Sequence, residues 1–170
     1  MKKGLIGGIG NIFFGDDGFG VEVISILKKE LHSCPFISLI DFGIRTIDLA
    51  LEITSGYQWA VLIDCVFLNK RPATLYLFDL EEWNDQHLCF DPHQMNLNNF
   101  PSFAKQFGPL PNQVILVGCE PYSIEEKIKL SKPVLEAAHV AADAIKKAVK
   151  VLLDSPQVVL SKEWLSSYFP

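Results

Sequence analysis

Five acidic side chains follow apolar segments of this sequence, at positions where they could share a cation. They are Asp16, Asp17, Asp41, Asp64 and Glu120. Carboxylates that lie close together raise the free-energy cost of ionising one another unless a cation shares the site. Their positions therefore indicate a metal-binding site. The simpler alternative is that each aspartate caps a helix or ends a turn.

His93 is the best placed of the four histidines to join such a site, because it starts an expected helix directly after Asp91 and Pro92. Together with Asp17 and Asp64 it would offer two carboxylates and one imidazole. This ligand set suits a first-row divalent metal ion. The alternative is an ordinary surface histidine at the start of a helix.

The glycine-rich turn at 7–20 does not form a nucleotide-binding motif. It contains neither GxGxxG nor GxxxxGK[ST], and its two acidic side chains would repel a pyrophosphate. Elsewhere neither HExxH nor GxSxG occurs, so the sequence does not identify a nucleophile. Gly18 and Gly20 fall where the first helix should begin, although glycine weakens a helix by roughly 0.8–1 kcal/mol relative to alanine. We interpret them as positions where another chain approaches the backbone closely.

Apolar runs alternate with helical patterns along the chain, which is typical of βαβ units and a mostly parallel sheet. We expect strands at 4–9, 36–40, 59–63, 73–80 and 113–119. The connection between the third and fourth strands is too short for a parallel crossover, so we expect the fourth strand to run antiparallel to the third. Ligands of such sheets bind outside the carboxyl ends of the parallel strands, where this sequence places its acidic side chains.

Helices are expected between these strands and after the last one. The first has an apolar stripe of Val21, Ile24, Leu27 and Leu31. A short helix should begin near Thr46, whose hydroxyl suits an N-cap, and the last long helix should begin near Lys132. A helix that starts near His93 should stop or kink before Pro101.

The composition fits a single globular domain over residues 1–170. The chain has 15 Lys and Arg against 20 Asp and Glu, a formal net charge of −5, and 49% hydrophobic residues. The acidic balance argues against binding to nucleic acid, which needs a concentrated basic surface. No run reaches the roughly 18–20 apolar residues of a membrane-spanning helix, so we expect no membrane association. Four widely spaced cysteines form no CxxC motif, and we expect reduced, buried thiols in a cytoplasmic protein.

The sequence resembles the hydrogenase maturation endopeptidases over about residues 4–148. The resemblance is carried by five segments in the same order: GIGNIFFGDDGFGVEVI at 8–24, LIDFG at 39–43, LIDCV at 62–66, DPHQM at 91–95 and LVGCEP at 116–121. It implies a three-layer α/β/α sandwich around a five-stranded, mostly parallel sheet with one antiparallel strand.

The resemblance also implies the activity and the substrate. The expected reaction removes the C-terminal extension of a nickel-loaded large-subunit precursor of a nickel–iron hydrogenase in one cut, after a His or Arg beyond the last metal-binding cysteine motif. The expected enzyme is a monomer without a permanently bound metal, and it recognises the nickel ion carried by its substrate.

The resemblance assigns site residues as well. The family's nickel contacts correspond to Asp17, Asp64 and His93, which are also the expected catalytic residues; the family often has Glu where this chain has Asp17. Expected substrate contacts are Asp16, Asp41, Gly43 and Glu120. The attacking water could be activated by the metal as a Lewis acid or by Asp17 or Asp64 as a general base.

Two other functions are compatible with these residues. A non-enzymatic, nickel-dependent assembly factor that docks on the same precursor would show the same three ligands. An unrelated α/β hydrolase or nucleotide-binding domain is the second alternative, and the missing phosphate-binding motifs count against it.

Overall fold

The computed structural model describes residues 4–31, 34–79, 99–155 and 158–170. A five-stranded sheet with the strand order β2-β1-β3-β5-β4 forms its centre. Its strands are β1 (Gly4–Ile9), β2 (Ile37–Gly43), β3 (Trp59–Cys65), β4 (Leu75–Asp79) and β5 (Gln113–Cys119). All neighbouring strands are parallel except β4, which pairs antiparallel with β5 at one edge. The predicted sheet is confirmed, although β4 lies beside β5 and not beside β3.

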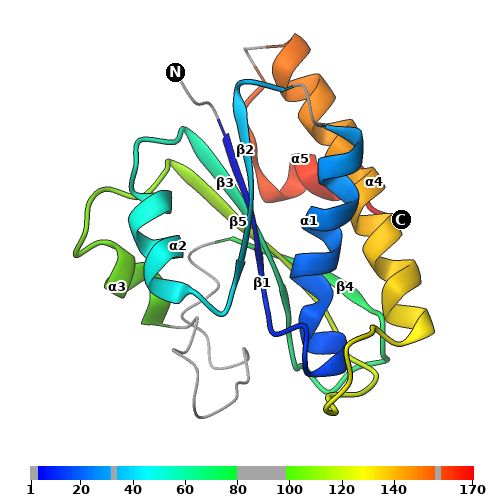
Figure 1. Ribbon diagram of the computed structural model, residues 1–170. Helices are drawn as coiled ribbons and strands as arrows, with labels where there is room; N and C mark the ends of the chain where they lie inside the picture. Colours follow the sequence, from blue (N-terminus) through cyan, green and yellow to red (C-terminus); the bar gives the residue numbers. More distant parts are fainter. Residues whose placement is uncertain (1–3, 32–33, 80–98, 156–157) are drawn as a thin grey trace.

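Helices cover both faces of this sheet and make a three-layer sandwich (Figure 1). They are α1 (Phe19–Glu30), α2 (Thr46–Ile53), α3 (Phe100–Ala104), α4 (Lys132–Asp154) and α5 (Lys162–Ser166). Helices α1, α4 and α5 pack with one face of the sheet in the larger apolar core. Helices α2 and α3 pack with the opposite face in the smaller core. None of the helices in the described ranges combines the length and the apolar character that a membrane span needs.

The burial of each strand follows from its place in the sheet. Every residue of β1 and β3 is buried, because both strands have a neighbour on each side and helices above and below. The edge strands β2 and β4 are mostly half-buried. Continuous apolar runs therefore identify the central strands, and they predicted β1 without error in its bounds.

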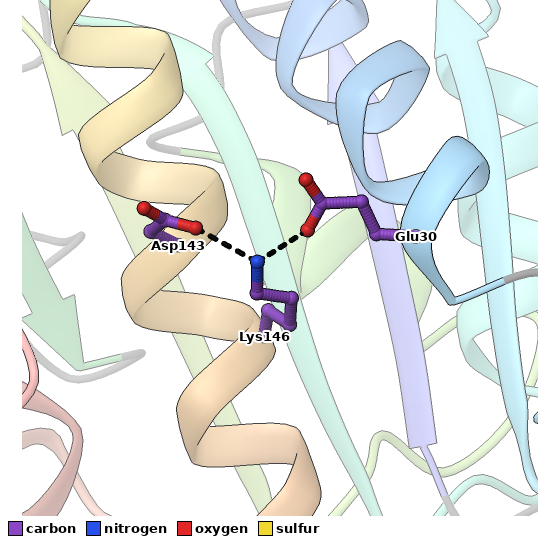
Figure 2. A network of polar contacts seen from close by, with 3 residues as sticks. All are labelled: Glu30, Asp143 and Lys146. Atoms are coloured by element: carbon purple, nitrogen blue, oxygen red, sulfur yellow. Dashed lines mark hydrogen bonds and ion pairs between the residues drawn. The ribbon is translucent and has the colours of Figure 1, made fainter.

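Lys146 joins the two long helices on one face of the sheet. Its ammonium group lies between Asp143, one turn earlier on α4, and Glu30 at the end of α1, as Figure 2 shows. The two carboxylates raise the pKa of Lys146, and the lysine lowers the pKa of Asp143. Because all three side chains are partly or largely solvated, this contact links the two helices but adds little to the stability of the fold.

Several helix details differ from the sequence expectations. Thr46 is the first residue of α2, and Arg45 holds the N-cap position without a capping side-chain bond. Pro101 lies in the first turn of α3, where its missing N–H costs nothing, and it does not end a described helix. Val21 is half-buried, whereas the buried stripe of α1 includes Val23. The helix predicted near His93 lies outside the described residues.

Gly20 marks the closest approach between α1 and the sheet. A Cβ atom at this position would lie 2.1 Å from the carbonyl oxygen of Ile63 and 2.4 Å from that of Ile9. The strands β1 and β3 of the same chain therefore occupy the space beside Gly20. Our interpretation that this glycine admits another chain was wrong. A glycine in the sequence can indicate that a backbone passes close by, but it does not reveal which backbone that is.

We expect Gly20→Ala to lower the free energy of unfolding by about 3 kcal/mol or more, because α1 would have to move away from two strands at once. Urea denaturation followed by circular dichroism measures the change. Lys28→Ala, at an exposed position of the same helix, is the control and should stay within about 0.5 kcal/mol of the wild type. Similar effects of the two substitutions would contradict this packing.

Candidate functional site

Asp17 and Asp64 meet at the carboxyl ends of β1 and β3. Asp64 is the penultimate residue of β3 and only 6% exposed, and its Oδ1 atom accepts a hydrogen bond of 2.7 Å from the backbone N–H of Cys65. Asp17 lies in the short 3₁₀ helix η1 (Gly15–Gly18), and its Oδ2 atom accepts one of 2.9 Å from the N–H of Asn11. Each carboxylate thus accepts a hydrogen bond from a nearby backbone N–H group. A metal site would need further ligands besides these two carboxylates.

Gly10 allows the turn after β1 to fold back onto Asp17. Its φ angle is +130°, and a Cβ atom there would lie 1.9 Å from the carbonyl oxygen of Asp17. Both the left-handed backbone and the close contact require glycine. The turn therefore places Asp17 beside the end of β3 because residue 10 has no side chain.

The pKa of Asp64 is raised well above the ordinary value of an aspartate. Burial is the largest cause, the charge of Asp17 adds to it, and the hydrogen bond from Cys65 opposes it. A cation placed between the two carboxylates would reverse both unfavourable contributions. The pair is therefore suited to bind a metal ion, or to exchange a proton with a reacting group when no cation is present.

The acidic side chains at this edge of the sheet do not form one cluster. Within the ranges that the structure describes, no three His, Cys, Asp or Glu side chains lie so that they could hold a metal ion together. His93, the third predicted ligand, lies outside these ranges. The structure thus brings two of the three predicted ligands together, and the remaining carboxylates have other neighbours.

Asp16 is completely buried, unlike its neighbour Asp17. Its carboxylate accepts four hydrogen bonds, from the backbone N–H groups of Tyr122, Ser123 and Ser131 and from the hydroxyl of Ser131, at 2.6 to 3.0 Å. Ser131 is the N-cap residue of α4, so the negative charge also lies at the positive end of the helix dipole. In this structure Asp16 fixes the segment 121–131. The substrate contact expected of Asp16 stays a prediction.

Glu120 plays a similar part for the segment that follows β3. Its carboxylate is 4% exposed and accepts hydrogen bonds from the N–H groups of Leu68 and Asn69 and from the hydroxyl of Tyr76. Burial and the contact with Glu120 raise the pKa of Tyr76 to about 12. Asn69 and Ala73 both have positive φ angles, so this carboxylate stabilises a strained connection. A direct contact of Glu120 with substrate stays a prediction.

Asp41 and Gly43 lie beside the turn after β1. The carbonyl oxygen of Gly43 accepts a hydrogen bond of 3.0 Å from the N–H of Gly10, and Gly43 has a φ of +54°. The register of β1 and β2 shifts at this point, and the backbone oxygen of Asp41 accepts a hydrogen bond from the Arg45 guanidinium. Both residues thus border the loop that carries Asp17, and their predicted substrate contacts stay predictions.

Sequence reasoning missed Ser131 and the segment 66–74 as parts of this arrangement. A serine directly before Lys132 and Pro133 is a usable N-cap signal, but its bond to Asp16 joins residues 115 positions apart. The donors for Glu120 lie 51 and 52 positions away. No local pattern could have found these partners.

The thiols near the site are poor nucleophiles. Cys65 and Cys119 are buried and free, and Cys34 is half-buried. Burial, followed by the charges of Asp16 and Glu120, raises the pKa of Cys119 to about 12. Burial and the nearby aspartates raise the pKa of Cys65 as well. Cys65 and Cys119 are therefore buried free thiols, as predicted. Cys34 is less buried than predicted, and Cys89 lies outside the described residues.

Comparisons with known proteins agree on one family. The model of the HycI hydrogenase maturation protease family matches residues 21–150. The hydrogenase expression/formation protein HoxM of Cupriavidus necator is 28% identical over 148 residues, which are 85% of this chain and 71% of the relative. The crystal structure of a hydrogenase 2 maturation peptidase from a Thaumarchaeota archaeon is 29% identical, with a TM-score of 0.65 over 88% of this chain and 99% of that one. The endopeptidase HybD of Escherichia coli shares the fold, with 22% identity and a TM-score of 0.74 over 87% and 92% of the two chains.

Asp16→Asn should destabilise the protein by about 2–4 kcal/mol. The amide keeps one accepting oxygen, but its NH₂ group would face backbone N–H donors and leave buried groups unsatisfied. Thermal and urea unfolding measure the loss. Asp48→Asn at an exposed position of α2 is the matched control, and an equal change in both variants would show that the buried hydrogen bonds contribute nothing.

Asp64→Asn should make the protein without bound metal more stable than the wild type at pH 8. The raised pKa means that the folded state favours protonated Asp64. The free energy of unfolding of the wild type therefore falls as the pH rises from about 4, the ordinary pKa of an aspartate, towards the raised pKa of Asp64. The asparagine keeps the shape and the oxygen facing Cys65 but has no charge to lose. Unfolding measured at pH 8 and pH 4 should show the gain shrinking at the lower pH; a loss of stability at pH 8 would refute the electrostatic conflict.

Proposed function

The chain belongs to the hydrogenase maturation protease family, and from this membership we propose how it selects and cuts its substrate. The chain is a peptidase of hydrogenase maturation, and the protease and peptidase names of the family and its relatives favour it over a non-enzymatic assembly factor. Its proposed substrate is the large-subunit precursor of a nickel–iron hydrogenase, from which it removes the C-terminal extension in one cut.

The observation that carries this proposal is the pair formed by Asp17 and buried Asp64. Two carboxylates with an unfavourable mutual charge gain from a cation that arrives with the substrate. We propose that the nickel ion of the precursor is this cation and that His93 supplies the third ligand. The enzyme then holds no permanent metal, because three ligands without a thiolate bind nickel weakly and release it with the product.

Nickel recognition also positions the scissile bond. Binding of the ion at the pair adds metal–ligand free energy to a modest peptide interface and fixes the tail near the catalytic groups, which raises the effective concentration of the scissile bond. Water adds across the amide, giving a new carboxyl end and a free amine. The attacking water is activated by nickel as a Lewis acid or by a carboxylate of the pair as general base.

The surroundings of the site complete the proposal. We place the reaction in the cytoplasm and assign it to a monomeric enzyme. Asp41 and Gly43 border the loop of Asp17 and are proposed to contact the precursor near the cut. Asp16 and Glu120 support the two segments that flank the pair.

We expect a nickel-loaded precursor to lose its tail when it is incubated with the wild-type protein, and a nickel-free precursor to stay uncut. Asp17→Asn and Asp64→Asn should each lower the rate at least about 100-fold, because even outer partners of metal ligands are worth about 10–100-fold. His93→Gln should lower the cleavage rate clearly while changing the free energy of unfolding little. The mass of the intact precursor measures each cut.

The matched control for the asparagine variants is Asp48→Asn, which removes an exposed carboxylate on α2 and should process normally. Equal cutting of loaded and nickel-free precursors would exclude nickel recognition. Normal processing by the Asp17 and Asp64 variants would mean that the two carboxylates are only turn and cap residues.

A further inference from the structure

Four large apolar side chains are exposed on two loops next to the site. Ile12, Phe13 and Phe14 follow the end of β1 with exposures of 44%, 60% and 39%, and Ile128 in the segment before α4 is 70% exposed. We call these four side chains the apolar surface. Solvated apolar groups gathered at one place on a folded protein mark an interaction surface more often than single exposed ones do.

The two loops are joined by specific backbone contacts. Phe14 and Lys127 form a parallel β-bridge, in which the N–H of Gly15 donates to Lys127 and the N–H of Lys127 donates to Phe13, at 2.7 and 2.9 Å. The buried Asp16 carboxylate holds the second loop from both of its ends, through Tyr122 and Ser131. The exposed side chains thus stand on a pre-organised frame, and a partner that binds them does not have to order these loops.

The shape of this region resembles the centre of a protein interface. Ile128 lines two hollows of about 250 and 340 Å³, one shared with Ile12 and the other with Phe13 and Phe14. Charged residues of both signs also line these hollows. They are Glu22 and Lys129 at the first, and Glu126 and Lys127 at the second. Specific protein contacts commonly combine apolar side chains with charged and polar groups around them.

The position of the apolar surface points to its occupant. Ile12 and Ile128 line the first hollow together with Gly15 and Gly18, the two ends of the short helix η1 that carries Asp17, so the apolar surface borders the candidate active site. A polypeptide held at Asp17 therefore lies next to these side chains.

We propose that the apolar surface docks the hydrogenase precursor through apolar side chains of the segment that flanks the scissile bond. This inference rests on the proposed function, because the occupant is the substrate of that reaction. Ile12, Phe13, Phe14 and Ile128 determine how tightly the precursor binds, whereas the carboxylate pair determines whether it is cut.

The test compares Phe13→Ala and Ile128→Ala with two controls at exposed positions away from the site. Phe36→Ala alters a 46% exposed phenylalanine before β2, at the amino end of the sheet, and Val159→Ala alters a 76% exposed residue between α4 and α5. With nickel-loaded precursor, both surface variants should raise KM roughly tenfold and leave kcat unchanged, because they remove binding and not chemistry. The controls should behave as the wild type.

An unchanged KM in both surface variants would overturn the docking proposal while leaving the peptidase in place. If the wild type does not cut the precursor at all, the proposed function fails. Docking is then measured as the Kd of the uncut precursor, which we expect to rise roughly tenfold in Phe13→Ala and Ile128→Ala. Sedimentation velocity tests whether a second copy of this chain binds the apolar surface instead. A dimer that dissociates in Phe13→Ala while KM is unchanged would assign the surface to a second copy and overturn the proposal.

Discussion

The buried carboxylate of Asp16 is the contact on which the arrangement of the site depends. It satisfies donors from both ends of the segment 121–131, including the N-cap residue of α4. A buried carboxylate is tolerated there because backbone N–H groups, a hydroxyl and a helix N-terminus surround it. Its neighbour Asp17 lies in the same 3₁₀ turn. The hydrogen bonds of Asp16 to the start of α4 therefore also fix the turn that directs the Asp17 carboxylate towards β3.

Asp64 shows the opposite electrostatic situation. Its carboxyl group is buried beside Asp17, and both burial and that charge oppose its ionisation. The protein thus maintains an unfavourable pair at the site, as active sites often do at the expense of stability. In the proposed mechanism, a positive ion delivered by the substrate would relieve this conflict only while the substrate is bound. A resident metal would relieve it permanently and would leave the site unable to distinguish a loaded precursor from an empty one.

The sequence predicted the sheet well because continuous apolar runs report burial directly. The bounds of β1 and β5 and the start of α4 were predicted correctly, while the ends of β2, β3 and β4 were displaced; β3 continues past its apolar run through Asp64 to Cys65. The failures have a common cause. The need for Gly20 arises from backbone atoms of β1 and β3, and the roles of Asp16 and Glu120 arise from donors far along the chain. Local patterns hold no information on such partners.

Asp16 and Asp17 illustrate how adjacent identical residues acquire different roles. A 3₁₀ helix has about three residues per turn, so successive side chains point roughly 120° apart. One aspartate therefore turns into the protein towards α4, and the next is directed to Asn11 and the end of β3. Phe13 and Phe14 directly precede this turn; their backbone pairs with that of Lys127, and their side chains are exposed. Residues 12–17 thus place the proposed docking side chains, the anchoring Asp16 and the proposed metal ligand Asp17 within six residues of chain, the last three of them in η1.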